Sequence, residues 1–105
     1  VWRLHKYWRG LKMEIPWVDR PPQDIVRDHV RFTLQPLDAP ESPDALAKVL
    51  DHMGSDDFLL FSTDYPHWQF DGGDALPPGL PRDLVRKILL DNPLETYSRL
   101  REEAP

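Results

Sequence analysis

The chain has 105 residues, enough for one small domain, and its 40% hydrophobic and 30% charged residues are ordinary for a soluble globular protein. The net charge of −5 argues against a nucleic acid or an acidic membrane surface as partner, because basic surfaces bind both. No apolar run approaches the roughly 18 residues that cross a bilayer, and the absence of Cys excludes disulfides, thiolate chemistry and Cys-based zinc sites.

The N-terminal segment combines a basic amphipathic stretch with a Pro-rich connector. Residues 1–8 place apolar side chains at near-helical spacing with Arg and Lys between them, which predicts the end of a helix that stops around Gly10. The segment lacks the continuous apolar region of a signal peptide. The absence of Cys is compatible with a reducing compartment, and we expect a cytoplasmic protein. Residues 15–22 contain three prolines and are expected to be semi-extended, with Trp17 as an anchor.

A strand–helix–strand unit follows a single helical turn expected over residues 22–27. Residues 30–35 alternate apolar and polar side chains, which is typical of a strand. Ser42-Pro43-Asp44 predicts a helix start, with Ser as N-cap, Pro at the first position and an acid in the first turn. Gly54 supplies the stop. The apolar positions of this helix fall on one face: Leu46, Val49, Leu50 and Met53.

The stretch from Phe58 to Trp68 is the part around which the chain is organised. Residues 58–61 form an uninterrupted apolar run, which predicts a strand buried on both faces of a parallel sheet. The order strand, helix, strand predicts two parallel strands joined by a right-handed crossover. Ligands bind at the carboxyl ends of such strands, so Asp64 and His67 are the first candidates for chemistry.

The C-terminal part reads as helices separated by turns. Residues 71–74, Asp-Gly-Gly-Asp, predict a flexible turn, and a Pro-rich loop follows it. Leu84, Val85, Ile88 and Leu89 mark an amphipathic helix. Asn92 reads as a new N-cap, with Pro93 at the first position and Glu95 placed for a capping box. The last helix is expected to turn Leu94 and Tyr97 inward and to fray near residues 101–103.

A sheet of only two parallel strands leaves both of its edges unpaired. Parallel sheets normally contain further strands and are covered by helices on both faces. The first helix also lacks an N-cap. The simplest interpretation is that the chain is the carboxyl-terminal part of a larger α/β fold.

Four segments in order carry a family resemblance: residues 17–22, residues 29–36, the run Ser62-Thr63-Asp64-Tyr65-Pro66-His67-Trp68, and residues 87–92. Together they resemble the C-terminal portion of the amidohydrolase-related family, metal-dependent hydrolases that include the aminocarboxymuconate-semialdehyde decarboxylase branch. The resemblance implies an α/β fold class, the C-terminal portion of a (β/α)₈ TIM-type barrel. Residues 1–105 would then form a single partial domain made of the last βαβα units.

The resemblance also implies a site. Asp64 corresponds to the carboxylate after strand eight, which in the family binds the catalytic divalent metal, expected to be zinc, or takes the proton of its water. His67 and Trp68 are then expected to bind substrate. The family's other metal ligands, histidines from strands one, five and in some members six, have no counterpart in this chain. Pro93 replaces the small residue that the family pattern suggests, which is benign at the start of a helix.

Each site residue also has a structural interpretation. Asp64 alone could cap the loop by accepting backbone N–H bonds, and His67 could serve only a loop hydrogen bond. Trp68 and Tyr65 could pack rather than wall a pocket. Ser62 and its neighbour Thr63 lack an adjacent base, which argues against covalent catalysis.

The remaining candidate ligands show no metal pattern. Three histidines share no ligand spacing: His5, His29 and His52. The acids at residues 56–57 and 71–74 lack the spacing of a calcium loop and are expected to be solvated turns.

The function expected from these residues is hydrolysis of a C–N or C–O bond by metal-activated water, or nonoxidative decarboxylation, on a small-molecule substrate. A catalytic zinc uses about three protein ligands, so this segment alone is expected to be inactive. The alternative is a non-catalytic remnant or interaction module that docks through its Trp-rich N-terminal segment and open strand edges. A homo-oligomer is compatible with both.

Overall fold

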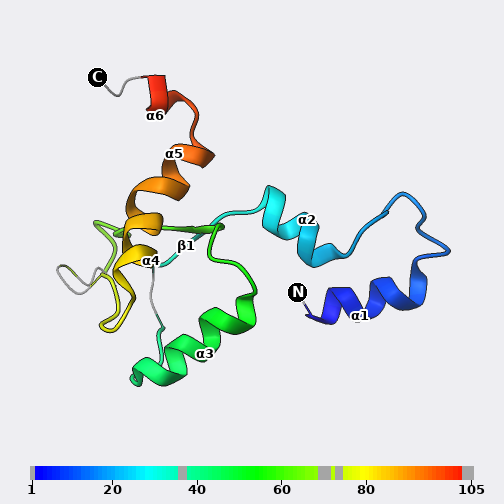
Figure 1. The fold of residues 1–105 in the computed structure, drawn as a ribbon, viewed down its shortest axis with the longest axis horizontal. Helices are drawn as coiled ribbons and strands as arrows, with labels where there is room; N and C mark the ends of the chain where they lie inside the picture. Colours follow the sequence, from blue (N-terminus) through cyan, green and yellow to red (C-terminus); the bar gives the residue numbers. More distant parts are fainter. Residues whose placement is uncertain (1, 36–37, 69–71, 73–74, 103–105) are drawn as a thin grey trace. The chain divides into compact units, whose positions relative to one another are not determined.

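A computed structural model describes residues 2–35, 38–68, 72 and 75–102, and the chain divides into two compact units, residues 1–31 and 32–105. Figure 1 shows the elements in chain order. The first unit holds α1 (Trp2–Leu11) and α2 (Pro22–His29). The second holds β1 (Phe32–Thr33), α3 (Pro43–Met53), β2 (Leu59–Leu60), α4 (Arg82–Arg86), η2 (Lys87–Asp91), α5 (Asn92–Thr96) and α6 (Arg99–Glu102). Apart from Gly72, the turn expected over residues 71–74 lies outside the described residues.

In the first unit, α1 confirms the expected amphipathic helix and ends at Leu11, one residue beyond the predicted stop. The tryptophan that anchors the Pro-rich connector is Trp8, whose Nε1 donates to the carbonyl oxygen of Val18 at 2.9 Å. The prediction that Trp17 is the anchor is wrong, because 76% of this residue is exposed. The Pro-rich segment bends back toward the preceding helix, and its own aromatic side chain faces solvent.

Helix α2 has two turns, and the expected single turn over residues 22–27 is too short. Pro22 begins the helix, where a missing N–H costs nothing. Asp24 lies in the first turn and forms an ion pair with Arg27, three residues on. The pair joins the first turn to the second and extends the helix to His29.

The sheet of the second unit contains β1 and β2, which are parallel, as predicted. Phe32 pairs with Leu59, and the N–H of Phe32 donates to the carbonyl oxygen of Phe58 at 2.7 Å. The strands are shorter than the six and four residues expected from the sequence, with two residues each. Leu59 and Leu60 are both buried, which confirms that β2 is covered on both faces.

Helix α3 begins and ends where the sequence predicts. The Ser42 hydroxyl accepts a hydrogen bond from the Ala45 N–H at 3.4 Å, and Gly54 ends the helix with a left-handed φ of 72°. Leu46 is buried, but Val49 is 46% exposed, so the expected apolar face is narrower than predicted. Leu50 and Met53 pack against the core of Phe58, Leu59, Leu84 and Ile88.

Helices α4, η2 and α5 follow one another without a break, drawn in yellow and orange in Figure 1. η2 is a π-helix, in which the Asn92 N–H donates to the Lys87 carbonyl oxygen five residues back. The prediction of a new N-cap at Asn92 is therefore wrong, because this residue has α-helical backbone angles and only 1% of it is exposed. The inward orientation predicted for Tyr97 is also wrong, since 55% of it is exposed.

The acids before β2 are held by a helix. The Lys87 ammonium forms ion pairs with the carboxylates of Asp56 and Asp57, which corrects the expectation that these acids form only a solvated turn. The ammonium donates hydrogen bonds to the carboxylates of Asp56 and Asp57, and these bonds, the one to Asp56 most strongly, raise the pKa of Lys87 from 10.5 to about 12. The charged lysine is therefore favoured in the folded chain.

This arrangement predicts a loss of stability at alkaline pH. Because the pKa of Lys87 is higher in the folded chain, the charged lysine makes its full contribution to stability at pH values below the unfolded pKa near 10.5. This contribution disappears as the pH rises through about 12. We expect the difference in thermal midpoint between the wild-type chain and Lys87→Met to be constant from pH 8 to about 10. It should then shrink toward pH 12. A difference that does not change over this interval would contradict the raised pKa of Lys87. Tyrosine ionisation affects the wild-type chain and the variant alike, so it does not alter the difference between them.

Candidate functional site

The site residues expected from the sequence lie on the loop that leaves the carboxyl end of β2. Phe61, Ser62 and Thr63 follow the strand, and Asp64 comes next. Because β2 is buried and paired, the loop starts from a fixed point. Gln35 follows β1, and since the strands are parallel, both chain segments leave the sheet at the same edge.

The loop folds back on itself at Asp64, whose backbone has a left-handed φ of 56°. Asp and Asn tolerate this conformation better than other residues with a side chain, apart from Gly. The N–H of His67 donates to the Asp64 carbonyl oxygen at 2.7 Å, and the Thr63 hydroxyl accepts from the Tyr65 N–H at 3.3 Å. These two hydrogen bonds make a tight turn that brings positions 64 and 67 together.

Among the three residues expected to form the site, Asp64 contacts His67 and His67 contacts Trp68. His67 Nδ1 lies 3.3 Å from Asp64 Oδ2, and the rings of His67 and Trp68 have centroids 5.5 Å apart. The side chain of Asp64 is 35% exposed and that of His67 is 47% exposed, while Trp68 is 83% exposed. A carboxylate, an imidazole and an indole are thus presented together and open to solvent.

The donor set fits part of a metal site. A carboxylate with one oxygen held by an imidazole still offers its other oxygen to a divalent cation, and carboxylate and imidazole are both usual zinc ligands. Throughout the described part of the chain, however, no three His, Asp or Glu side chains come together. His5, His29 and His52 lie on α1, α2 and α3, and His29 Nε2 contacts Arg20 at 3.5 Å. The loop therefore supplies one ligand, or at most two.

Sequence reasoning missed two buried polar residues near the strands. Gln35 is 7% exposed although it is one of the polar residues of the alternating pattern, and its Nε2 donates to the Ala75 carbonyl oxygen at 2.8 Å. Asn92 donates through Nδ2 to the carbonyl oxygens of Asp56 and Leu59, both at 2.8 Å. A sequence signal for Asn92 was its position four residues after the buried Ile88, on the same helix face.

Residues 3–99 match the sequence model of the amidohydrolase family, and this range includes the loop from Asp64 to Trp68. The chain belongs to the amidohydrolase family. No curated protein matches the chain.

Membership of the amidohydrolase family supports a hydrolase-like origin for the strand-end loop. It also agrees with a fragment of a TIM-type barrel, since α helices and two parallel strands are present, but two strands do not establish a barrel. Within the described residues, helices of the length and apolarity needed to cross a membrane are absent.

Proposed function

We propose that this chain provides the strand-end carboxylate of a metal-dependent hydrolase of the amidohydrolase family. In this proposal Asp64 binds a divalent metal, zinc in the first instance, and a small-molecule substrate is cleaved at a C–N or C–O bond. The observation that carries the proposal is the contact of His67 Nδ1 with Asp64 Oδ2 at the carboxyl end of a buried parallel strand.

The roles of the three residues follow from their contacts. A bound divalent metal would supply Lewis-acid polarisation of the substrate and would acidify a water molecule. His67 Nδ1 lies 3.3 Å from Asp64 Oδ2, and in this proposal a proton on Nδ1 is donated to that oxygen, which leaves Oδ1 to bind a metal or accept a proton. The same carboxylate is a proton acceptor for the attacking water. Trp68 offers a flat apolar surface beside the imidazole, suited to the apolar part of a substrate.

The proposed active site is completed by residues outside this chain. One carboxylate and one imidazole fall short of the roughly three protein ligands of a catalytic zinc. The two-stranded sheet also leaves strand edges without partners among the described residues. We therefore propose that the chain acts as the C-terminal part of a barrel enzyme. The family match is to amidohydrolases, which supports hydrolysis as the proposed reaction, with nonoxidative decarboxylation as the alternative at the same site.

Metal removal tests this proposal. We expect the enzyme that contains this chain to lose hydrolysis of amide and ester substrates after dialysis against a chelator, and to regain it when zinc is added. The physical reason is that the proposed reaction needs a metal both to polarise the substrate and to acidify water. Full activity in the chelated enzyme, with metal analysis showing less than one equivalent in ten, would refute the proposal.

The isolated 105-residue chain is the matched control. With one or two ligands it should bind zinc only weakly in a calorimetric titration, and Asp64→Asn should abolish the residual heat. Tight zinc binding that is lost in Asp64→Asn would mean that the ligands are assembled within the chain or between copies. In that case the completed-barrel part of the proposal would fall, and the metal role of Asp64 would stand.

A further inference from the structure

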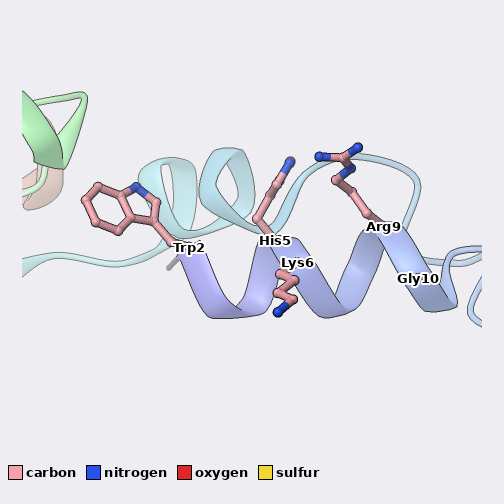
Figure 2. A pocket seen from close by; sticks show the side chains of 5 residues that line it. All are labelled: Trp2, His5, Lys6, Arg9 and Gly10. Atoms are coloured by element: carbon pink, nitrogen blue, oxygen red, sulfur yellow. The ribbon is translucent and has the colours of Figure 1, made fainter.

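A surface hollow lies along α1. Its volume is about 380 Å³, and its lining residues come from one stretch of the helix: Trp2, His5, Lys6, Arg9 and Gly10. This volume is in the range of small-molecule sites. Figure 2 shows the side chains of Trp2, His5 and Arg9 on the same side of α1, while Lys6 leaves from the other side. Positions i, i+3 and i+7 of a helix share one face, so the shared side follows from the sequence spacing.

Arg9 is the arginine of this unit without a partner among the described residues. Arg20 and Arg27 form ion pairs with Asp28 and Asp24. Arg3 lies over the ring of Tyr7, 5.8 Å from its centroid. Arg31 donates to backbone carbonyl oxygens. A guanidinium presents a planar fork of N–H donors that matches a carboxylate. The hollow therefore contains an unused carboxylate-binding group.

His5 adds a second donor with a defined direction. Its Nδ1 is enclosed and has no hydrogen-bond partner among the described residues, and its ring packs 5.7 Å from that of Trp8. A proton on Nδ1 would be a buried donor without an acceptor, so the favourable tautomer carries its proton on Nε2. The Nε2–H is then the group through which His5 can donate to a ligand beside Arg9.

We propose that Trp2, His5 and Arg9 form a binding site for a small planar carboxylate, such as an aromatic or conjugated acid. The Arg9 guanidinium binds the carboxylate, the His5 Nε2–H donates to one of its oxygens, and the flat part of the acid stacks on the Trp2 indole. A phosphate dianion is expected to bind less well, because it has no flat apolar part that could stack on the Trp2 indole. The site lies within α1 and does not depend on the proposed role of Asp64.

The test uses the 105-residue chain, labelled with ¹⁵N and titrated with benzoate while amide and indole resonances are followed by NMR. We expect benzoate to bind with a dissociation constant on the order of 1 mM, with shifts confined to residues 2–10. Benzamide, which has the same shape without the charge, should bind at least about tenfold more weakly. Cyclohexanecarboxylate, which has the charge without the flat ring, should also bind more weakly, and inorganic phosphate should bind more weakly than benzoate.

Two variants separate the site from general attraction of anions. Arg9→Gln should weaken benzoate binding at least about tenfold, whereas Lys12→Gln, which removes the same charge from an exposed position beyond the end of α1, should change it by less than about twofold. Both side chains are exposed, and circular dichroism checks that both variants fold. Equal weakening in both variants, equal affinity for benzamide, or tighter binding of phosphate would each overturn the proposal.

Discussion

Asp64→Asn is expected to lower kcat of the enzyme that contains this chain by about 10²–10⁴-fold. Asn has the shape of Asp but lacks the charge that binds a cation and accepts a proton. The substitution suits the backbone, because Asn tolerates the left-handed φ of 56° at this position as well as Asp does. The fold should therefore survive, and steady-state kinetics with a circular dichroism melt on the same sample measures both effects.

A graded comparison controls for general damage to the loop. His67→Phe keeps a ring beside Trp68 but removes the Nδ1 that contacts the Asp64 carboxylate. Because the carboxylate remains and only its orientation is released, we expect kcat to fall by about tenfold, less than in Asp64→Asn. Near-normal activity of Asp64→Asn would rule out a catalytic role for this carboxylate.

Asn92→Ala is expected to destabilise the chain by about 2–4 kcal/mol, the largest effect on stability that we predict. The buried amide donates to the carbonyl oxygens of Asp56 and Leu59, so its loss leaves two acceptors without this donor and opens a small cavity. A small domain has only about 5–15 kcal/mol of stability in total, so this loss should be visible in a urea titration.

Leu90→Ala is the matched control for Asn92→Ala. Leu90 lies in η2, two residues earlier, and is 47% exposed, so we expect its truncation to cost less than about 1 kcal/mol. If Asn92→Ala were no more destabilising than Leu90→Ala, the two hydrogen bonds of Asn92 would contribute nothing to the link between the helix and β2.

The elements that sequence predicts correctly are those with local determinants. Helix α3 begins at a Ser42 cap and ends at a left-handed Gly54, both within a few residues of the helix. The contact of Asp64 with His67, which was not predicted, is also local, because a hydrogen-bonded turn over residues 64–67 brings the two together. The parallel pairing of β1 and β2 follows from their order around α3, since a strand, a helix and a second strand favour a parallel crossover.

The errors arise where distant groups decide the outcome. Asn92 before a proline has the local signature of an N-cap, but its amide is satisfied by carbonyl oxygens 36 and 33 residues away. The acids before β2 look like a solvated turn until Lys87, 31 residues later, pairs with them. A full ligand set for the proposed metal site could not be predicted from this sequence, and the described residues hold no group of three candidate ligands.

The π-helical turn at Lys87–Asp91 constrains how this chain can change in length. The turn holds one residue more than an α-helical turn, because the Asn92 N–H bonds to the carbonyl oxygen five residues back. A deletion of one residue there leaves an ordinary α-helical turn, so the residues on either side can keep their orientation. A deletion of one residue from α4, which has α-helical turns, would instead rotate Asn92 by about 100° and turn it away from Leu59. A one-residue deletion should therefore be tolerated in the π turn but not in α4.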